Sequence, residues 1–134
     1  MKHVFLLLCS LFYFSTYSTN IEGLINSDTT WSGTVTVTAD VTVTGNHTLT
    51  ISNGTIVLLK KGANIIVSDS SSLLVNGTSV SKVFFKCLSA GDNFGALKAR
   101  GPQSKMQINY TEIQNGQVAA YDTAEVYLYD SYFS

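Results

Sequence analysis

Apolar and polar residues alternate in short runs from Thr34 to Phe85, and the runs recur at a spacing of about eight positions. Within each run the apolar residues stand at positions i and i+2, so they point to one face of an extended strand. Glycine, asparagine, aspartate and serine separate the runs, as at Asn53-Gly54, where turns are expected. The pattern predicts seven strands, with cores at 35–37, 41–43, 49–51, 56–58, 65–67, 73–75 and 83–85.

A longer period lies above the first, because the steps from Val41 to Ile65, from Leu49 to Leu73 and from Leu73 to Leu97 are equal. Three strands fill one such period, and a fixed repeat is typical of a solenoid. We therefore predict an all-β fold, a right-handed parallel β-helix (solenoid) with about three short strands per coil of roughly 24 residues. The residues at these steps should point inward in stacked columns: Val41, Ile65, Leu49, Leu73 and Leu97. An antiparallel sandwich is the main alternative, but its strands need not recur at a fixed length.

The strand rhythm loosens beyond Cys87. Residues 89–94 are expected to form a loop, and further strands are expected at 95–99, 106–113, 117–121 and 125–129. The series stops without a visible polar cap after Ser131, and an uncapped solenoid end favours edge pairing. Either the natural product extends beyond this chain, and the β-helix is incomplete at its C-terminus, or the chain self-associates through this C-terminal edge.

Residues 1–18 have the pattern of a signal peptide: Lys2, an apolar core at 4–14, and small residues before the expected cut. The apolar core is shorter than the roughly 20 residues that a membrane span requires. We expect no stable membrane span after signal cleavage, and a secreted, extracellular protein. The predicted organisation is a signal peptide at 1–18, an N-terminal lead-in and cap at 19–33, and a parallel β-helix domain at 34–134. Four apolar residues of the lead-in are expected to close the core: Ile21, Leu24, Ile25 and Trp31.

The whole chain carries a formal net charge of −1, and loss of Lys2 with the signal peptide leaves about −2. This balance argues against nucleic acid, which requires a clustered basic face. Cys87 is then the only cysteine, which excludes a disulfide within the mature chain and favours a buried thiol over an intermolecular bridge. His47 is the only histidine of the expected mature chain, and a lone histidine beside a turn is usually a surface residue.

Four sequons for N-linked glycosylation follow the predicted signal peptide. Their asparagines are Asn46, Asn53, Asn76 and Asn109, and none has proline at the middle position. The first three lie at predicted turns, where an attached glycan would not disturb packing. The sequons agree with a eukaryotic secretory route.

Several phrases of the chain belong to a recognisable type: Asp40-Val-Thr-Val43, His47-Thr-Leu-Thr-Ile51, Asn53-Gly-Thr-Ile56 and Leu73-Leu-Val-Asn-Gly-Thr78, followed by Lys82-Val-Phe-Phe85. In these phrases, and over roughly residues 30–130, the chain resembles secreted right-handed parallel β-helix proteins of the pectate-lyase-like (pectin lyase-like) superfamily. The resemblance implies a fold. It implies no activity, because the superfamily spans polysaccharide lyases, hydrolases, adhesins and proteins without known activity.

The catalytic motifs of the pectin-cleaving members have no counterpart in this sequence. The Asn-Thr-Asp and Gly-His-Gly triplets, the Asp pair and the Arg-x-Lys pair of the hydrolases do not occur, and Lys98-Ala-Arg100 has the reverse order. The lyases bind calcium through clustered carboxylates, whereas Asp92, Asp122 and Asp130 are isolated in sequence. We expect Lys98-Ala-Arg100 to be a surface strand, and we expect no catalytic residue, no cofactor and no metal site. Asp92 and Asp122 would be the first candidates if cleavage occurred.

Two residue types suggest surface roles. Thr-x-Thr phrases between Thr34 and Thr50 resemble the arrays of ice-binding solenoids, but the residues one period later, such as Ile66 and Leu74, interrupt the ladder. Threonine also favours strands through its β-branching. Aromatic residues crowd the end of the chain and could either bind a partner or form the core and stack of the last coil: Tyr121, Tyr127, Tyr129, Tyr132 and Phe133.

The leading functional hypothesis is a secreted or cell-surface β-helix module that binds glycans or proteins without catalysis of its own. A rigid multi-strand surface and the missing catalytic motifs favour it. The first alternative is a fragment of a polysaccharide lyase or glycoside hydrolase, and the second is an ice- or mineral-binding protein. The expected partners are carbohydrate or an extracellular protein.

Overall fold

The computed structural model describes residues 19–134, so the predicted signal peptide at 1–18 lies outside the described residues. Within 19–134 the regular structure consists of strands alone: β1 (Thr19–Ile25), β2 (Thr29–Trp31), β3 (Thr34–Val43), β4 (Thr48–Ile51), β5 (Ile56–Leu59), β6 (Ile65–Val67), β7 (Ser72–Asn76), β8 (Val83–Cys87), β9 (Ala96–Arg100), β10 (Lys105–Asn109), β11 (Thr111–Ile113), β12 (Gln117–Tyr121), β13 (Glu125–Tyr129) and β14 (Tyr132–Phe133). In this part of the chain, no helix has the length and apolar character needed to cross a membrane.

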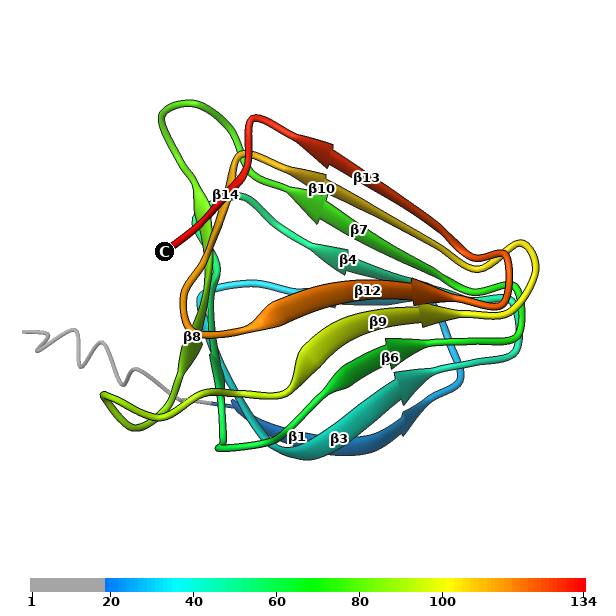
Figure 1. Cartoon of the computed structure of the whole chain (residues 1–134), viewed down its shortest axis with the longest axis horizontal. Coiled ribbons are helices and arrows are strands. Elements are labelled where there is room, and N and C mark those ends of the chain that lie inside the picture. The colour runs from blue at the N-terminus through cyan, green and yellow to red at the C-terminus, as the bar shows by residue number, and fades with distance from the viewer. Residues whose placement is uncertain (1–18) are drawn as a thin grey trace, which may run out of the picture.

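The strands form three rows, and every strand pair within a row is parallel. The first row contains the second half of β3, then β6, β9 and β12. The second row contains β2, β4, β7, β10 and β13. The third row contains the first half of β3, then β5, β8, β11 and β14. In Figure 1 the second row lies above the first, and β8 and β14 stand at the left.

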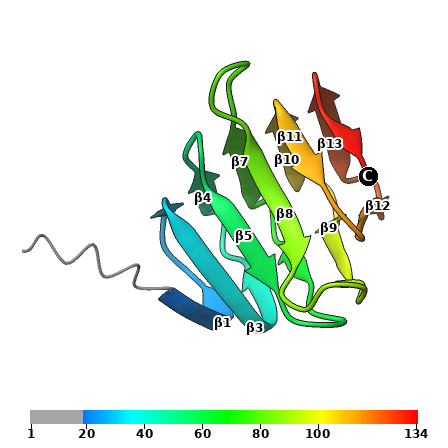
Figure 2. The same ribbon diagram turned by 90° about the vertical axis from the view of Figure 1, so that its left-hand side faces the viewer.

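The chain visits the three rows in turn and then returns to the first, one strand further along. We call one passage through the three rows a coil. Figure 2 shows β3, β5 and β8 side by side, with β1 at one end of the molecule and β13 at the other. The resulting structure is all-β, with parallel strands in strongly curled sheets, and it is compatible with a β-helix-like solenoid.

Apolar columns run through the coils and form the core. Leu49, Leu73 and Met106 stand in register on successive strands of the second row, and each is at most 1% exposed. Val41 and Ile65 do the same in the first row. Since complete burial of such a side chain contributes about 1.5–3 kcal/mol, the columns are the main stabilising element.

The predicted parallel strands are confirmed, but one column assignment is wrong. The segments at 35–37 and 41–43 are the two arms of β3, which pair in parallel with β5 and β6 and form no hairpin. Leu97 does not stack on Leu73: it pairs with Ile65 of the preceding coil, and Met106 follows Leu73. The β7–β8 and β8–β9 connections both lengthen that coil, so the regular period of the earlier coils does not hold there.

Two smaller expectations are also corrected. The segment 106–113 is not one strand, because Tyr110 takes a left-handed conformation with φ of 45° and separates β10 from β11. In the lead-in, Trp31 is 4% exposed and Ile21 and Ile25 pack against the core, as predicted. Leu24, however, is 72% exposed and closes nothing, because alternation along β1 turns it outward between Gly23 and Ile25.

A series of side-chain hydrogen bonds, which we call the corner ladder, connects successive coils at the corner between the third and first rows. The Asp40 carboxylate accepts hydrogen bonds from the backbone N–H and the side-chain amide of Asn64, at 2.9 and 3.0 Å. One coil further on, the Asn64 Oδ1 atom accepts the backbone N–H of Ala96 at 2.9 Å. Asn64 thereby joins three consecutive coils where the third row turns into the first.

Candidate functional site

The first row carries a hollow of about 240 Å3, lined by Ile66 on β6, Lys98 and Arg100 on β9, and Tyr121 on β12. We call it the lateral hollow. Alternation along β9 creates it: Leu97 and Ala99 are fully buried, so the side chains of Lys98 and Arg100 project outward. The prediction that this segment is a surface strand is confirmed.

Strand register brings the lining residues together. Lys98 stands beside Ile66 on one side and Ala119 on the other. Arg100 stands beside Tyr121, whose side chain is 50% exposed. The neighbours of Lys98 are apolar and short compared with its own side chain, which leaves room around its ammonium group.

The two cations are differently engaged. The Nε atom of Arg100 lies 3.4 Å from the Asp122 carboxylate, with both side chains mostly exposed to solvent. An exposed pair of this kind contributes at most about 1 kcal/mol, so a ligand can replace it. Lys98 takes part in no ion pair among residues 19–134. The hollow therefore offers two cationic groups to an anion.

A second hollow of about 480 Å3 continues from Arg100 around the corner toward Asp69 and Pro102. Arg100 lines both hollows, and Asp122 lies at the second one. The two hollows together form a strip on one side of the molecule, with Ile66, two cations and one exposed tyrosine in the lateral hollow and the carboxylates of Asp69 and Asp122 at the second. An anionic sugar fits the lateral hollow, because guanidinium and ammonium groups bind carboxylates or sulfates and an aromatic ring offers a stacking surface. The two carboxylates disfavour an anion at the second hollow.

The four sequon asparagines lie away from the strands of the first row. Asn46, Asn53 and Asn76 are exposed: the first lies in the turn from β3 to β4, the second in the turn from β4 to β5, and the third ends β7. Asn109 ends β10 and is half-buried, and its side-chain amide donates to the Val75 carbonyl at 3.1 Å. Glycosylation of these residues stays a prediction.

The acidic residues considered for catalysis are spread over separate corners. Asp92 pairs with Lys61 at 3.0 Å, and Asp122 pairs with Arg100. Asp130 is exposed in the turn after β13. Within residues 19–134 no group of three potential ligand residues converges in a way that could hold a metal ion.

The single histidine and the single cysteine of residues 19–134 are both half-buried. His47 lies 3.4 Å from the Asp28 carboxylate. The backbone N–H of Thr48, with a further contribution from His47, lowers the pKa of Asp28 below its usual 3.8. Cys87 is a free thiol that packs against the core but is only half-buried, so the expected burial is confirmed in part.

The threonine phrases do not form a continuous array. In the first row Thr42 pairs with Ile66, and in the second row Thr50 pairs with Leu74. Both interruptions agree with the sequence-based expectation. Thr30 stands beside Thr50 in the second row, but Leu74 follows, so the threonine array ends in the first coils.

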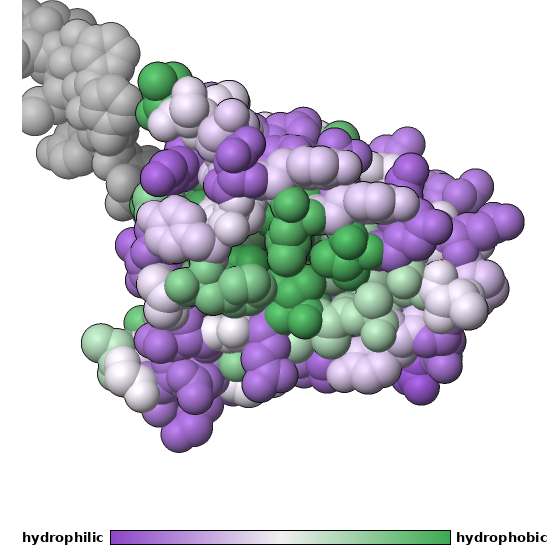
Figure 3. All heavy atoms as spheres, turned by 45° about the horizontal axis from the view of Figure 1, so that its top comes forward, coloured by the Kyte–Doolittle hydropathy of each residue, from purple (hydrophilic) through white to green (hydrophobic). Residues whose placement is uncertain are grey.

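The C-terminal end of the molecule exposes the last members of the core columns. Val118 and Val126 are half-buried, Leu128 is 42% exposed and Phe133 is 53% exposed, although the preceding members of their columns are fully buried. Figure 3, which looks toward this end, shows an apolar patch surrounded by polar side chains. The tyrosines of the last coil project outward instead, including Tyr127, whose hydroxyl donates to Glu125.

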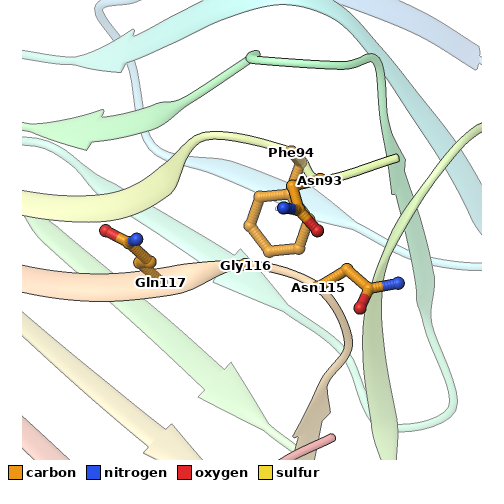
Figure 4. A pocket seen from close by; sticks show the side chains of 5 residues that line it. All are labelled: Asn93, Phe94, Asn115, Gly116 and Gln117. Atoms are coloured by element: carbon orange, nitrogen blue, oxygen red, sulfur yellow. The ribbon is translucent and has the colours of Figure 1, made fainter. Parts of the chain in front are cut away.

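A small polar hollow next to the β8–β9 loop has a structural role. Figure 4 shows the Phe94 ring lying against Gly116, with the amide side chains of Asn93, Asn115 and Gln117 around it. A Cβ atom at Gly116 would come within 1.9 Å of the ring, and Phe94 is 3% exposed. The loop residue Phe94 thus fills the space above the next coil, and the absence of a side chain at Gly116 permits it.

Comparison with known proteins identifies no relative: the chain matches no protein-family model, no curated protein and no solved structure. The assignment of the lateral hollow as a candidate site therefore depends on its geometry alone. The sequence-based reasoning did not assign it, because its residues come from three different coils. The one available signal was the pair of cations at i and i+2 in Lys98-Ala-Arg100.

Proposed function

We propose that this protein is a secreted, right-handed parallel β-helix module that binds an anionic glycan along the first row. The observation that carries the proposal is the lateral hollow, in which Lys98, Arg100 and Tyr121 lie on adjacent parallel strands over Ile66. A right-handed path agrees with the strong preference of parallel crossover connections for that hand. The resemblance to pectate-lyase-like proteins supports the same architecture.

The chemistry of the hollow favours an acidic sugar over a neutral one. Charge-assisted hydrogen bonds from a guanidinium or an ammonium group are about twice as strong as neutral ones. The exposed face of Tyr121 can stack against the apolar side of a sugar ring. Successive strands stand about 4.8 Å apart, so the two cations and the tyrosine can contact neighbouring sugars of one chain.

A glycan array probed with the secreted protein, followed by titration with the best ligand, tests the proposal. We expect binding to uronic-acid-containing or sulfated glycans and tenfold or greater loss in Lys98→Gln and Arg100→Gln. Each removes one charge-assisted bond, worth about 1.5–3 kcal/mol. Lys61→Gln is the matched control, since Lys61 is 73% exposed and pairs with Asp92 at another corner. Equal loss in all three variants would reduce the effect to net charge and contradict a defined site.

A further inference from the structure

Three of the four sequons lie at one edge of the molecule. Asn53 follows β4, Asn76 ends β7 and Asn109 ends β10, and these three strands are consecutive members of the second row. Asn76 and Asn109 are direct partners in register. The fourth, Asn46, lies in the turn between the first and second rows, where its N–H donates to the Asp69 carbonyl.

Asn76 and Asn109 are not equally suited to carry a glycan. Their backbones stand about 4.8 Å apart, the spacing of paired strands, which is less than the width of a sugar ring with its hydroxyl groups. Asn109 has a second neighbour, Tyr129, on its other side in the same row. Its amide already donates to the Val75 carbonyl, and its side chain is half-buried where that of Asn76 is exposed.

Asn53 stands beside a hollow of the third row that is lined by both apolar and polar residues, the polar ones being Ser79, Ser81 and Lys82. Gly54, the next residue, lines this hollow of about 430 Å3 together with Ile56, Phe84 and Val80, and Val80 is 94% exposed. A glycan on Asn53 would lie over these side chains. The lateral hollow has no sequon on any of its three strands.

From this distribution we propose that the secreted protein carries N-linked glycans on Asn46, Asn53 and Asn76, that Asn109 stays unmodified, and that the sugars leave the strands around the lateral hollow as a bare face. The inference rests on the proposed function for the role of that face. The glycan map itself depends only on entry into the secretory pathway. The sugar on Asn46 would border the second hollow at Asp69, and those on Asn53 and Asn76 would shield the corner between the second and third rows, so ligand binding would be confined to the lateral hollow.

The modification is a transfer from a lipid-pyrophosphate-linked oligosaccharide. The bond between C1 of the first sugar and the pyrophosphate oxygen breaks, and a bond between C1 and the asparagine Nδ2 forms. The Nδ2 atom loses one proton, and the lipid pyrophosphate leaves with the bonding electron pair. Transfer occurs on the unfolded chain, so the fold acts afterwards: a sugar on Asn109 would have to fit at a half-buried position between Asn76 and Tyr129, and we expect chains modified there to fold poorly and to be retained in the cell.

Expression of the full chain in a eukaryotic secretory cell and site mapping by mass spectrometry test the glycan map. We expect three glycans on the secreted protein, loss of one in Asn76→Gln and no change in Asn109→Gln. Comparable occupancy of Asn76 and Asn109 in the same secreted molecules would overturn the assignment. An unmodified Asn46 or Asn53 would overturn it as well.

Two single substitutions test the bare face, because each creates a serine sequon. Ile66→Asn places one in the lateral hollow, with Ser68 as the third residue, and Thr50→Asn places one in the second row, with Ser52. Once glycosylation at each new site is verified, we expect at least tenfold weaker glycan binding for Ile66→Asn and a change below twofold for Thr50→Asn. Ile66→Gln removes the same side chain without a sequon and isolates the effect of the glycan.

The outcomes separate the two proposals. Undiminished binding by glycosylated Ile66→Asn, or equal loss in Thr50→Asn, overturns the assignment of the first row as the binding face. Absence of any glycan ligand for the unaltered protein contradicts the proposed function, while the map of three occupied sequons would still stand.

Discussion

Replacement of Asn64 by alanine measures what a corner ladder contributes to stability. The substitution removes three side-chain hydrogen bonds: from the amide to Asp40 and to the Gly62 carbonyl, and from the Ala96 N–H to Oδ1. The first two are exposed and contribute little. Ala96 is only 5% exposed, so its N–H loses its partner where water is scarce. An orphaned buried donor costs about 1–3 kcal/mol, and the total is about 2 kcal/mol.

Urea unfolding followed by circular dichroism gives this quantity directly. Asn64→Asp is an informative second variant, because it keeps an acceptor for Ala96 but places a carboxylate against Asp40 within hydrogen-bond distance. We expect that variant to be destabilised at neutral pH and to recover when acidification removes the repulsion. Asn93→Ala serves as the matched control, since Asn93 is exposed and its side chain makes no hydrogen bond within the described part of the chain. An Asn64→Ala variant no less stable than Asn93→Ala would refute the ladder argument.

Three further expectations concern separate parts of the molecule. Ser104→Ala should raise the free energy of unfolding by about 1 kcal/mol, because the buried hydroxyl has no hydrogen-bond partner within residues 19–134; urea unfolding checks it. The Tyr132 hydroxyl lowers the pKa of Glu112 below 4.5, so the docking of β14 is fully stabilised above pH 4.5 and weakens as pH falls through the lower folded value. A tyrosine-fluorescence acid titration should show this transition, and Tyr132→Phe should weaken it, since Gln114 and Ser134 also hydrogen-bond Glu112. Leu128→Lys should reduce self-association through the C-terminal apolar end in micromolar light scattering, and Val80→Lys should not; equal scattering by both variants would contradict that interface.

The strand pattern could be predicted because alternation and turn residues are local properties of the sequence. All seven strand cores from 35 to 85 exist, but the inward face predicted at 56–58 is wrong: Val57 and Leu59 are fully buried, and Ile56 and Leu58 face outward. The stacking partner of Leu97 could not be predicted in this way, because register depends on how many residues each corner absorbs. The lateral hollow was missed for the same reason: the chain between Ile66 and Lys98 is longer than the chain between Lys98 and Ala119, yet both neighbours pair with Lys98.

The corners between the third and first rows tolerate very different lengths without loss of register. Residues 88–95 fill one such corner and 114–116 the next, yet β6, β9 and β12 remain in continuous parallel pairing. Doubling the length of a flexible loop costs only about 0.6 kcal/mol. The length of a corner loop therefore has little effect on the stability of the paired strands. Gly91 is exposed, and no atom lies within 4 Å of the position a Cβ would take there. Foreign peptides inserted near Gly91 would therefore be displayed on the frame of parallel strands. The same separation gives the molecule room to acquire new recognition loops without redesign of its core.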